Sequence, residues 1–144
     1  MNKAASLRGM ATASYWADDV KAARDWYAEL LGVEAYFQQP NAEQPAYVEF
    51  RIGDDEDELG IIDRRYAPKA MPPGPGGVVL YWHVADVDGT FERLKALGAQ
   101  AWEPITKRGE SGFVTASVVD PFGNILGIMS NPHYAAVVAA RAAS

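Results

Sequence analysis

Apolar side chains recur at intervals of three and four residues along two stretches of the chain, and this spacing predicts two amphipathic helices. Asp19 and Asp86 stand directly before these stretches, where a carboxylate can cap a helix N-terminus, and Gly32 and Gly98 follow them. The first apolar stripe consists of Val20, Ala23, Tyr27, Leu30 and Leu31, and the second consists of Val87, Phe91, Leu94 and Leu97.

Short extended runs, bounded by Gly, Pro, Asn and Asp, surround each helix and predict strands. The first half is expected to contain strands at Met10–Ala17, Glu34–Gln38, Ala46–Ile52 and Leu59–Arg64, and the second half at Val78–Val84, Gln100–Glu103, Phe113–Val119 and Ile125–Asn131. Beyond Pro132, the run "HYAAVVAARAA" predicts a short terminal helix.

The two halves repeat one plan of strand, helix and three strands. Asp19 corresponds to Asp86, and "LGII" at Leu59–Ile62 corresponds to "LGIM" at Leu126–Met129. We therefore expect an α+β fold in which two tandem βαβββ modules pair their sheets around a cleft. A single domain over 1–144 is expected to consist of a first module at 10–66, a Pro- and Gly-rich linker at 67–77, a second module at 78–131 and a helical tail at 132–144.

Composition narrows the classes of function. The chain has 144 residues, of which 49% are hydrophobic and 22% charged, as expected for one soluble globular domain. The absence of cysteine excludes disulfides, thiolate nucleophiles and cysteine-ligated metals. A net charge of -6 argues against nucleic acid or an anionic membrane as partner. No apolar run approaches a bilayer span and no signal peptide is evident, so a cytoplasmic location is expected.

Three phrases carry a resemblance to a known family: "DVKAARDWYAELLG", "VADVDGTFERLKALGA" and "DPFGNILGIM". Locally, the last of these predicts a turn over Asp120–Asn124 followed by a strand. Together with the duplicated order of elements, they resemble the vicinal oxygen chelate superfamily over about residues 10 to 131. That superfamily includes glyoxalases, bleomycin-resistance proteins, extradiol dioxygenases and fosfomycin-resistance enzymes. The resemblance implies a fold and leaves the activity open.

The resemblance also implies where a metal would be bound. Metal-using members carry a His on the first strand of each module and a carboxylate or amide on the fourth strand. The corresponding positions here hold Thr12, Val79, Gly127 and Gly60, with Ile61 replacing Gly60 if the register slips by one residue. None of these side chains is a good ligand for a divalent cation, so no metal cofactor is expected. A non-standard site built from His83, Glu49 and Glu58 remains an alternative.

Alternation along the strands assigns side chains to the expected cleft. The expected lining residues are Thr12, Ser14, Trp16, Tyr47, Arg51, Ile62, Val79, Tyr81 and Met129. His83 and Glu49 are the candidates for acid-base catalysis, although His83 could equally be a structural histidine and Glu49 could pair with Arg51 at the rim. The aromatic residues could also fill a dry core between the modules.

Three hypotheses of function follow. The first is a metal-free member of the superfamily that binds a small organic molecule and could sequester it, as bleomycin-resistance proteins do. The alternative is a glyoxalase-like lyase or isomerase that acts on a small oxygenated substrate, using a displaced metal or His83 and Glu49. A third hypothesis assigns the duplicated sheets mainly to dimerisation, and a homodimer is expected because members of the family commonly pair or swap modules.

Overall fold

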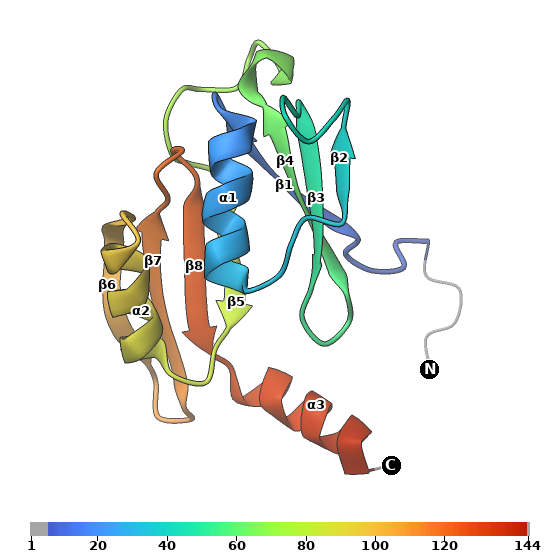
Figure 1. Ribbon diagram of the computed structural model, residues 1–144. Coiled ribbons are helices and arrows are strands. Elements are labelled where there is room, and N and C mark those ends of the chain that lie inside the picture. The colour runs from blue at the N-terminus through green and yellow to red at the C-terminus, as the bar shows by residue number, and fades with distance from the viewer. Residues whose placement is uncertain (1–5, 144) are drawn as a thin grey trace.

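The computed structural model describes residues 6–143, which form two four-stranded sheets and three α-helices (Figure 1). The first module contains β1 (Thr12–Ala17), α1 (Val20–Leu31), β2 (Phe37–Gln39), β3 (Tyr47–Ile52) and β4 (Asp57–Asp63), followed by a 3-10 helix, η1 (Arg64–Tyr66). The second contains β5 (Leu80–His83), α2 (Val87–Ala96), β6 (Gln100–Arg108), β7 (Phe113–Val119) and β8 (Ile125–Ser130), and is followed by α3 (Pro132–Ala143).

Both sheets have the same topology. The strand order is β1-β4-β3-β2 in the first sheet and β5-β8-β7-β6 in the second, and the first two strands of each sheet run parallel. The remaining neighbours in each sheet are antiparallel. The predicted α+β fold of two βαβββ modules is therefore confirmed.

The helix termini follow the predicted chemistry. The Asp19 side chain accepts a hydrogen bond from the Ala22 amide at 3.0 Å, and Asp86 accepts one from the Gly89 amide, also at 3.0 Å. Gly32 closes α1 with φ of 72°, in the left-handed region that a side chain disfavours. No helix of residues 6–143 is long and apolar enough to cross a membrane.

The helices cover one face of each sheet, and their buried stripes form one continuous core. In Figure 1, α1 runs along the boundary between the two sheets, and α2 lies against the second sheet. Val48 and Phe50 of β3 are fully buried, as is Tyr27 of α1. Trp26 of α1 links the modules, because its Nε1 donates to the Leu97 carbonyl oxygen at 2.7 Å.

Several element boundaries differ from the predicted ones. β1 begins at Thr12 rather than Met10, because pairing with β4 starts there, and β5 covers only Leu80–His83, the residues that pair with β8. β2 begins at Phe37, three residues later than expected, and Arg64 belongs to η1 rather than to a strand. β6 continues past Glu103 to Arg108, because β7 offers it a partner along its whole length. The predicted terminal helix is confirmed as α3.

Candidate functional site

The turn "DPFGN" joins the two modules. Its first residue, Asp120, is only 3% exposed, and its Oδ1 accepts hydrogen bonds from the amides of Phe122 at 2.9 Å and Asn124 at 2.8 Å. The Tyr27 hydroxyl, from α1 of the first module, donates to Oδ2 of the same carboxylate. Asp120 therefore closes its own turn and also binds the opposite module.

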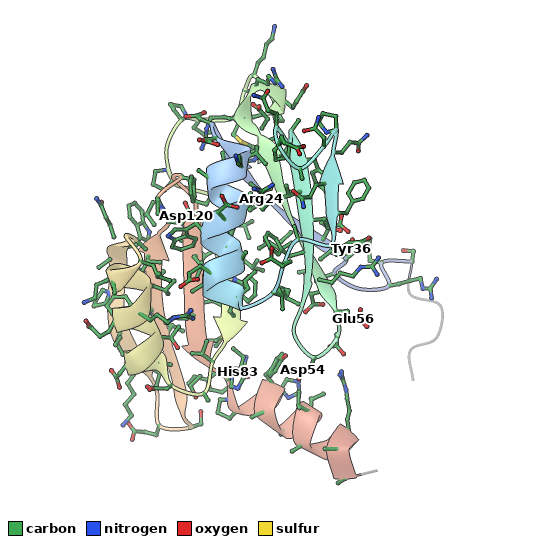
Figure 2. The ribbon with its side chains drawn as sticks, viewed as in Figure 1. Arg24, Tyr36, Asp54, Glu56, His83 and Asp120 are labelled. Carbon is green, nitrogen blue, oxygen red and sulfur yellow. The ribbon has the colours of Figure 1, made fainter. Side chains whose placement is uncertain are left out.

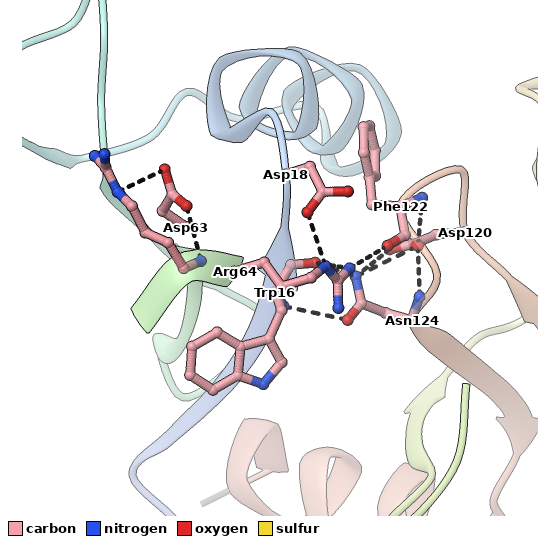
Figure 3. A network of polar contacts seen from close by, with 8 residues as sticks. Trp16, Asp18, Asp63, Arg64, Asp120, Phe122 and Asn124 are labelled. Atoms are coloured by element: carbon pink, nitrogen blue, oxygen red, sulfur yellow. Dashed lines mark hydrogen bonds and ion pairs between the residues drawn. The ribbon is translucent and has the colours of Figure 1, made fainter. Parts of the chain in front are cut away.

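Asn124, the last residue of that turn, holds the β1 backbone beside the site. Its Oδ1 accepts from the Trp16 amide at 3.2 Å, and its Nδ2 donates to the Trp16 carbonyl oxygen at 2.9 Å. Arg64 reinforces this joint by donating to the Phe122 carbonyl oxygen at 2.7 Å while its Nε pairs with Asp18 at 3.1 Å (Figure 3). The joint fixes Trp16 at the boundary between the modules.

A cleft of about 950 Å³ opens at this boundary. Its walls are formed by strands β1 and β5, the β3–β4 turn, the linker segment and the start of α3. Its larger and charged lining residues include Tyr15, Trp16, Ile52, Asp54, Asp57, Glu58, Leu59, Arg64, Met71, Leu80, Tyr81, Trp82, His83, Ile125 and Tyr134, together with the prolines at 72, 73 and 75. The walls are largely apolar and aromatic, with carboxylates grouped at the β3–β4 turn.

The residues expected to line the cleft divide into two sets. The cleft brings together Thr12, Ser14 and Trp16 of β1 with Tyr81 and His83 of β5. The expected residues outside its lining, among those described, are Tyr47, Glu49, Arg51, Ile62, Val79 and Met129. Sequence reasoning did not assign Trp82, Tyr134 or the linker residues to the cleft. Alternation had put Trp82 on the opposite face, and nothing local fixes the path of the linker.

Tyr47, Glu49 and Arg51 lie on the face of the first sheet that α1 does not cover. The Tyr47 hydroxyl donates to Glu49 Oε1 at 2.5 Å, and partial burial and this bond raise the pKa of Tyr47 above its ordinary value. The Arg51 guanidinium lies over the ring of Tyr36, 4.0 Å from its centre, and donates to its hydroxyl at 2.7 Å. These contacts form a polar and aromatic surface that adjoins the cleft at Glu58, which accepts from the Thr12 hydroxyl at 2.8 Å.

His83 has one ring nitrogen already engaged. Its Nδ1 accepts a hydrogen bond from the Asn131 amide at 3.0 Å, so a neutral ring carries its proton on Nε2. The ring also stacks on Tyr134 with centres 4.7 Å apart, and the Tyr134 hydroxyl donates to Asp54 at 2.6 Å. This last bond raises the pKa of Tyr134 to about 12. Figure 2 shows His83 and Asp54 near the start of α3, where the two modules meet.

The positions that hold metal ligands in metal-using members of the family are unsuited to a metal in this chain. A β-carbon built on Gly127 would lie 2.6 Å from the ring of Tyr81, and one built on Gly60 would lie 3.0 Å from the ring of Tyr47. Aromatic rings therefore pack on both glycines, in the space above the fourth strand of each sheet. Among residues 6–143, no three His, Asp or Glu side chains converge in a way that could hold a metal ion.

Comparison with known proteins agrees with this architecture. A family model described as the Glyoxalase/Bleomycin resistance protein/Dioxygenase superfamily matches residues 9–128. The chain belongs to this superfamily. A comparison with curated proteins gives no match. The superfamily fold is also found in the solved structures that resemble the chain.

Three of these structures illustrate the range of proteins that share the fold. A glyoxalase-related enzyme from Fulvimarina pelagi is 24% identical, with a TM-score of 0.67, over 88% of this chain and 90% of that one. Lactoylglutathione lyase from Agrobacterium tumefaciens is 22% identical, with a TM-score of 0.64, over 88% and 96%. TnmS3, an antibiotic binding protein from Streptomyces sp. CB03234, is 23% identical, with a TM-score of 0.63, over 88% and 98%.

Proposed function

We propose that this member of the superfamily binds a small organic molecule in the cleft between β1 and β5, and that it does so without a metal. The observation that carries the proposal is the cleft itself, about 950 Å³ in volume with Trp16, Tyr81 and Trp82 among its lining residues. Apolar and aromatic walls with a few polar groups are typical of small-molecule sites. The likeness to TnmS3, an antibiotic binding protein, supports sequestration of a drug or metabolite as the purpose of binding.

The absence of a metal is proposed from the donor groups. Divalent cations require several convergent oxygen or nitrogen ligands, and Thr12, Gly60, Val79 and Gly127 do not supply such a set. The tyrosine rings that pack on the two glycines would also have to move before any metal could approach. Organic ligands need no such set, because stacking and hydrogen bonding to the cleft walls are sufficient.

A glyoxalase-like lyase or isomerase remains the alternative, and the lyase from Agrobacterium tumefaciens gives it some support. Two observations argue against acid-base catalysis by His83 and Glu49: their locations differ, and one ring nitrogen of His83 is already hydrogen-bonded. His83 lines the cleft, whereas Glu49 accepts from Tyr47 on the uncovered face of the first sheet and does not line the cleft. In addition, neutral His83 carries its proton on Nε2, so it is suited to donate a hydrogen bond to a ligand rather than to act as a general base.

A fluorescence titration tests the proposal. Two of the tryptophans, Trp16 and Trp82, line the cleft, so a bound aromatic compound is expected to quench their emission. Within a panel of aromatic and cationic antibiotics, some compounds are expected to quench the tryptophan fluorescence of the wild type. The same compounds should fail to bind the Trp16→Ala variant. Trp102→Ala is the matched control, because Trp102 is an exposed residue of β6 outside the cleft lining. Absence of quenching across the panel, together with turnover of the methylglyoxal-glutathione adduct, would favour the enzyme.

We also propose that the protein works in the cytoplasm as a homodimer, with no nucleic acid as partner. The uncovered face of the first sheet, with exposed Tyr36 and Phe37, supports pairing with a second copy. The net charge of -6 disfavours contact with a nucleic-acid backbone. Light scattering tests the dimer directly, since a monomer across the working concentration range would contradict it.

A further inference from the structure

One buried hydroxyl group of the second module has no partner. Ser117 lies in the middle of β7 and is only 1% exposed, and its Oγ forms no hydrogen bond with any described residue. An unpaired buried hydroxyl costs folding free energy, and native proteins leave few such groups. The unpaired hydroxyl of Ser117 is therefore not explained by the stability of the fold, and a bound ligand could supply its missing partner.

Ser117 belongs to a row of residues that pair across the second sheet. Tyr81 of β5, Gly127 of β8 and Ser117 of β7 are paired in one row across the sheet, so their side-chain positions share one face. Because Gly127 has no side chain, the Tyr81 ring packs directly on it, with Cδ1 2.6 Å from where a β-carbon would stand. The ring therefore occupies the space above Gly127, and Ser117 is the next residue of the row on the other side of that glycine.

Tyr81 is weakly held in this position. It is 39% exposed, it stands on an edge strand, and its hydroxyl makes no hydrogen bond with the described residues. Rotation of its side chain would break no hydrogen bond and would uncover the space above Gly127, with Ser117 beside it. Tyr81 also lines the cleft, so this space would become an extension of the cleft.

The first module provides a contrast in the corresponding row, which consists of Ser14, Gly60 and Glu49. There the ring that packs on the glycine belongs to Tyr47, which is anchored because its hydroxyl donates to Glu49 at 2.5 Å. The hydroxyl of the ring over Gly60 thus forms a hydrogen bond, and Glu49, a polar residue of that row, accepts it. In the second module neither the covering tyrosine nor the polar residue has a partner among the residues that the structure describes.

We propose that Tyr81 is a movable cover over a polar subsite, in which the Ser117 hydroxyl binds an oxygen atom of the ligand. This inference rests on the proposed binding function of the cleft and specifies its ligand class. A hydroxyl can donate one hydrogen bond and accept two. The row continues to Glu103 of β6, which pairs with Ser117, but Glu103 is exposed and no charged group of the row is buried to balance an ion. The subsite therefore takes a neutral carbonyl or hydroxyl group carried on a flat apolar body, such as a phenol, a quinone or an aryl ketone.

Two probes of nearly equal shape test the subsite: 2-naphthol, and 2-methylnaphthalene as its counterpart without the oxygen. Their dissociation constants are measured by equilibrium dialysis with the wild type and three variants. In Ser117→Ala, the preference for 2-naphthol is expected to fall by about fivefold, the size of one neutral hydrogen bond. Ser111→Ala, at an exposed turn, is the matched control and should keep the wild-type preference. Tyr81→Ala removes a ring of the cleft wall, so both probes are expected to bind more weakly, but the ratio of their dissociation constants should stay at the wild-type value because the subsite is then open.

A thermal melt of the same variants separates a binding role from a structural one. Ser117→Ala is expected to melt at or above the wild-type temperature, since it removes an unpaired buried hydroxyl. A lower melting temperature, or an unchanged preference for 2-naphthol in Ser117→Ala, would overturn the subsite while leaving the cleft intact. Loss of the preference in Tyr81→Ala would assign it to the Tyr81 hydroxyl instead and would also overturn the inference. Failure of both probes to bind any form would contradict the proposed function itself and the subsite with it.

Discussion

Replacing Tyr27 by Phe removes the hydroxyl that joins α1 to the turn of the second module. In the wild type this hydroxyl donates to the carboxylate of Asp120, a residue that is only 3% exposed. Hydrogen bonds to charged groups contribute about 1.5–3 kcal/mol each, and Asp120 keeps its bonds to the Phe122 and Asn124 amides in the variant. We therefore expect Tyr27→Phe to lower the free energy of unfolding by about 2 kcal/mol.

Urea denaturation followed by circular dichroism measures this loss. With a typical slope of about 2 kcal/mol per molar urea, the midpoint should fall by about 1 M without a change of slope. Tyr66→Phe is the matched control, because Tyr66 is 61% exposed and donates no hydrogen bond among the described residues. A change of less than about 0.5 kcal/mol in Tyr27→Phe would refute the idea that this bond holds the modules together.

The same variant changes the response to alkaline pH. Burial, and then the negative charge of Asp120, raise the pKa of Tyr27 well above its ordinary value of 10.0. Below pH 10 the tyrosine is neutral in both states and its contribution is fully present. As pH rises above 10, only the unfolded state loses the proton, so stability falls by up to about 1.4 kcal/mol per pH unit for this group. Tyr27→Phe should show a shallower alkaline decline, and an equal slope would contradict the assigned cause.

Three further substitutions test other parts of the structure. Asn124→Ala removes both bonds to the β1 backbone and should cost about 2 kcal/mol of stability in urea denaturation. Gly127→Ala should lower the free energy of unfolding by about 1–3 kcal/mol, and by more than Gly60→Ala does. The new methyl group at Gly127 meets a backbone oxygen at 3.0 Å as well as a ring, whereas at Gly60 it meets only a tyrosine side chain. Equal losses in the two variants would contradict this geometry. Tyr134→Phe removes a hydrogen bond to Asp54 at an exposed site, so the free energy of unfolding should fall by less than about 1 kcal/mol. Hydrogen exchange of the backbone amides in α3 should become faster. Unchanged exchange would show that this bond does not hold α3 in place.

The fold could be predicted from the sequence because its signals are local and occur twice. The stripe around Tyr27, the caps at Asp19 and Asp86, and strand alternation each depend on residues a few positions apart. Errors in strand length arose where a partner strand decides the end, as at Arg108, which pairs with Phe113. Local patterns carry no information about how long a partner strand is.

The site was less predictable, because it depends on contacts between distant parts of the chain. Asp120 was interpreted as turn geometry, and its bond to Tyr27 spans 93 positions. Tyr47 and Arg51 lie on the face of the first sheet opposite the core, but alternation cannot show whether that face lines a cleft, because only the relative position of the two sheets decides where a cleft opens. The same reason explains why Trp82 was missed.

Thermal melting of the protein after removal of metals by a chelator tests whether the cleft binds an organic molecule without a metal. We expect at least one oxygenated aromatic compound, at about a hundred times its dissociation constant, to raise the melting temperature of the chelated protein by roughly 5 to 10 °C. Addition of zinc or nickel should change neither the melting temperature nor this shift. Stabilisation by one equivalent of metal, with no effect of any organic compound until the metal is restored, would show that binding depends on a metal.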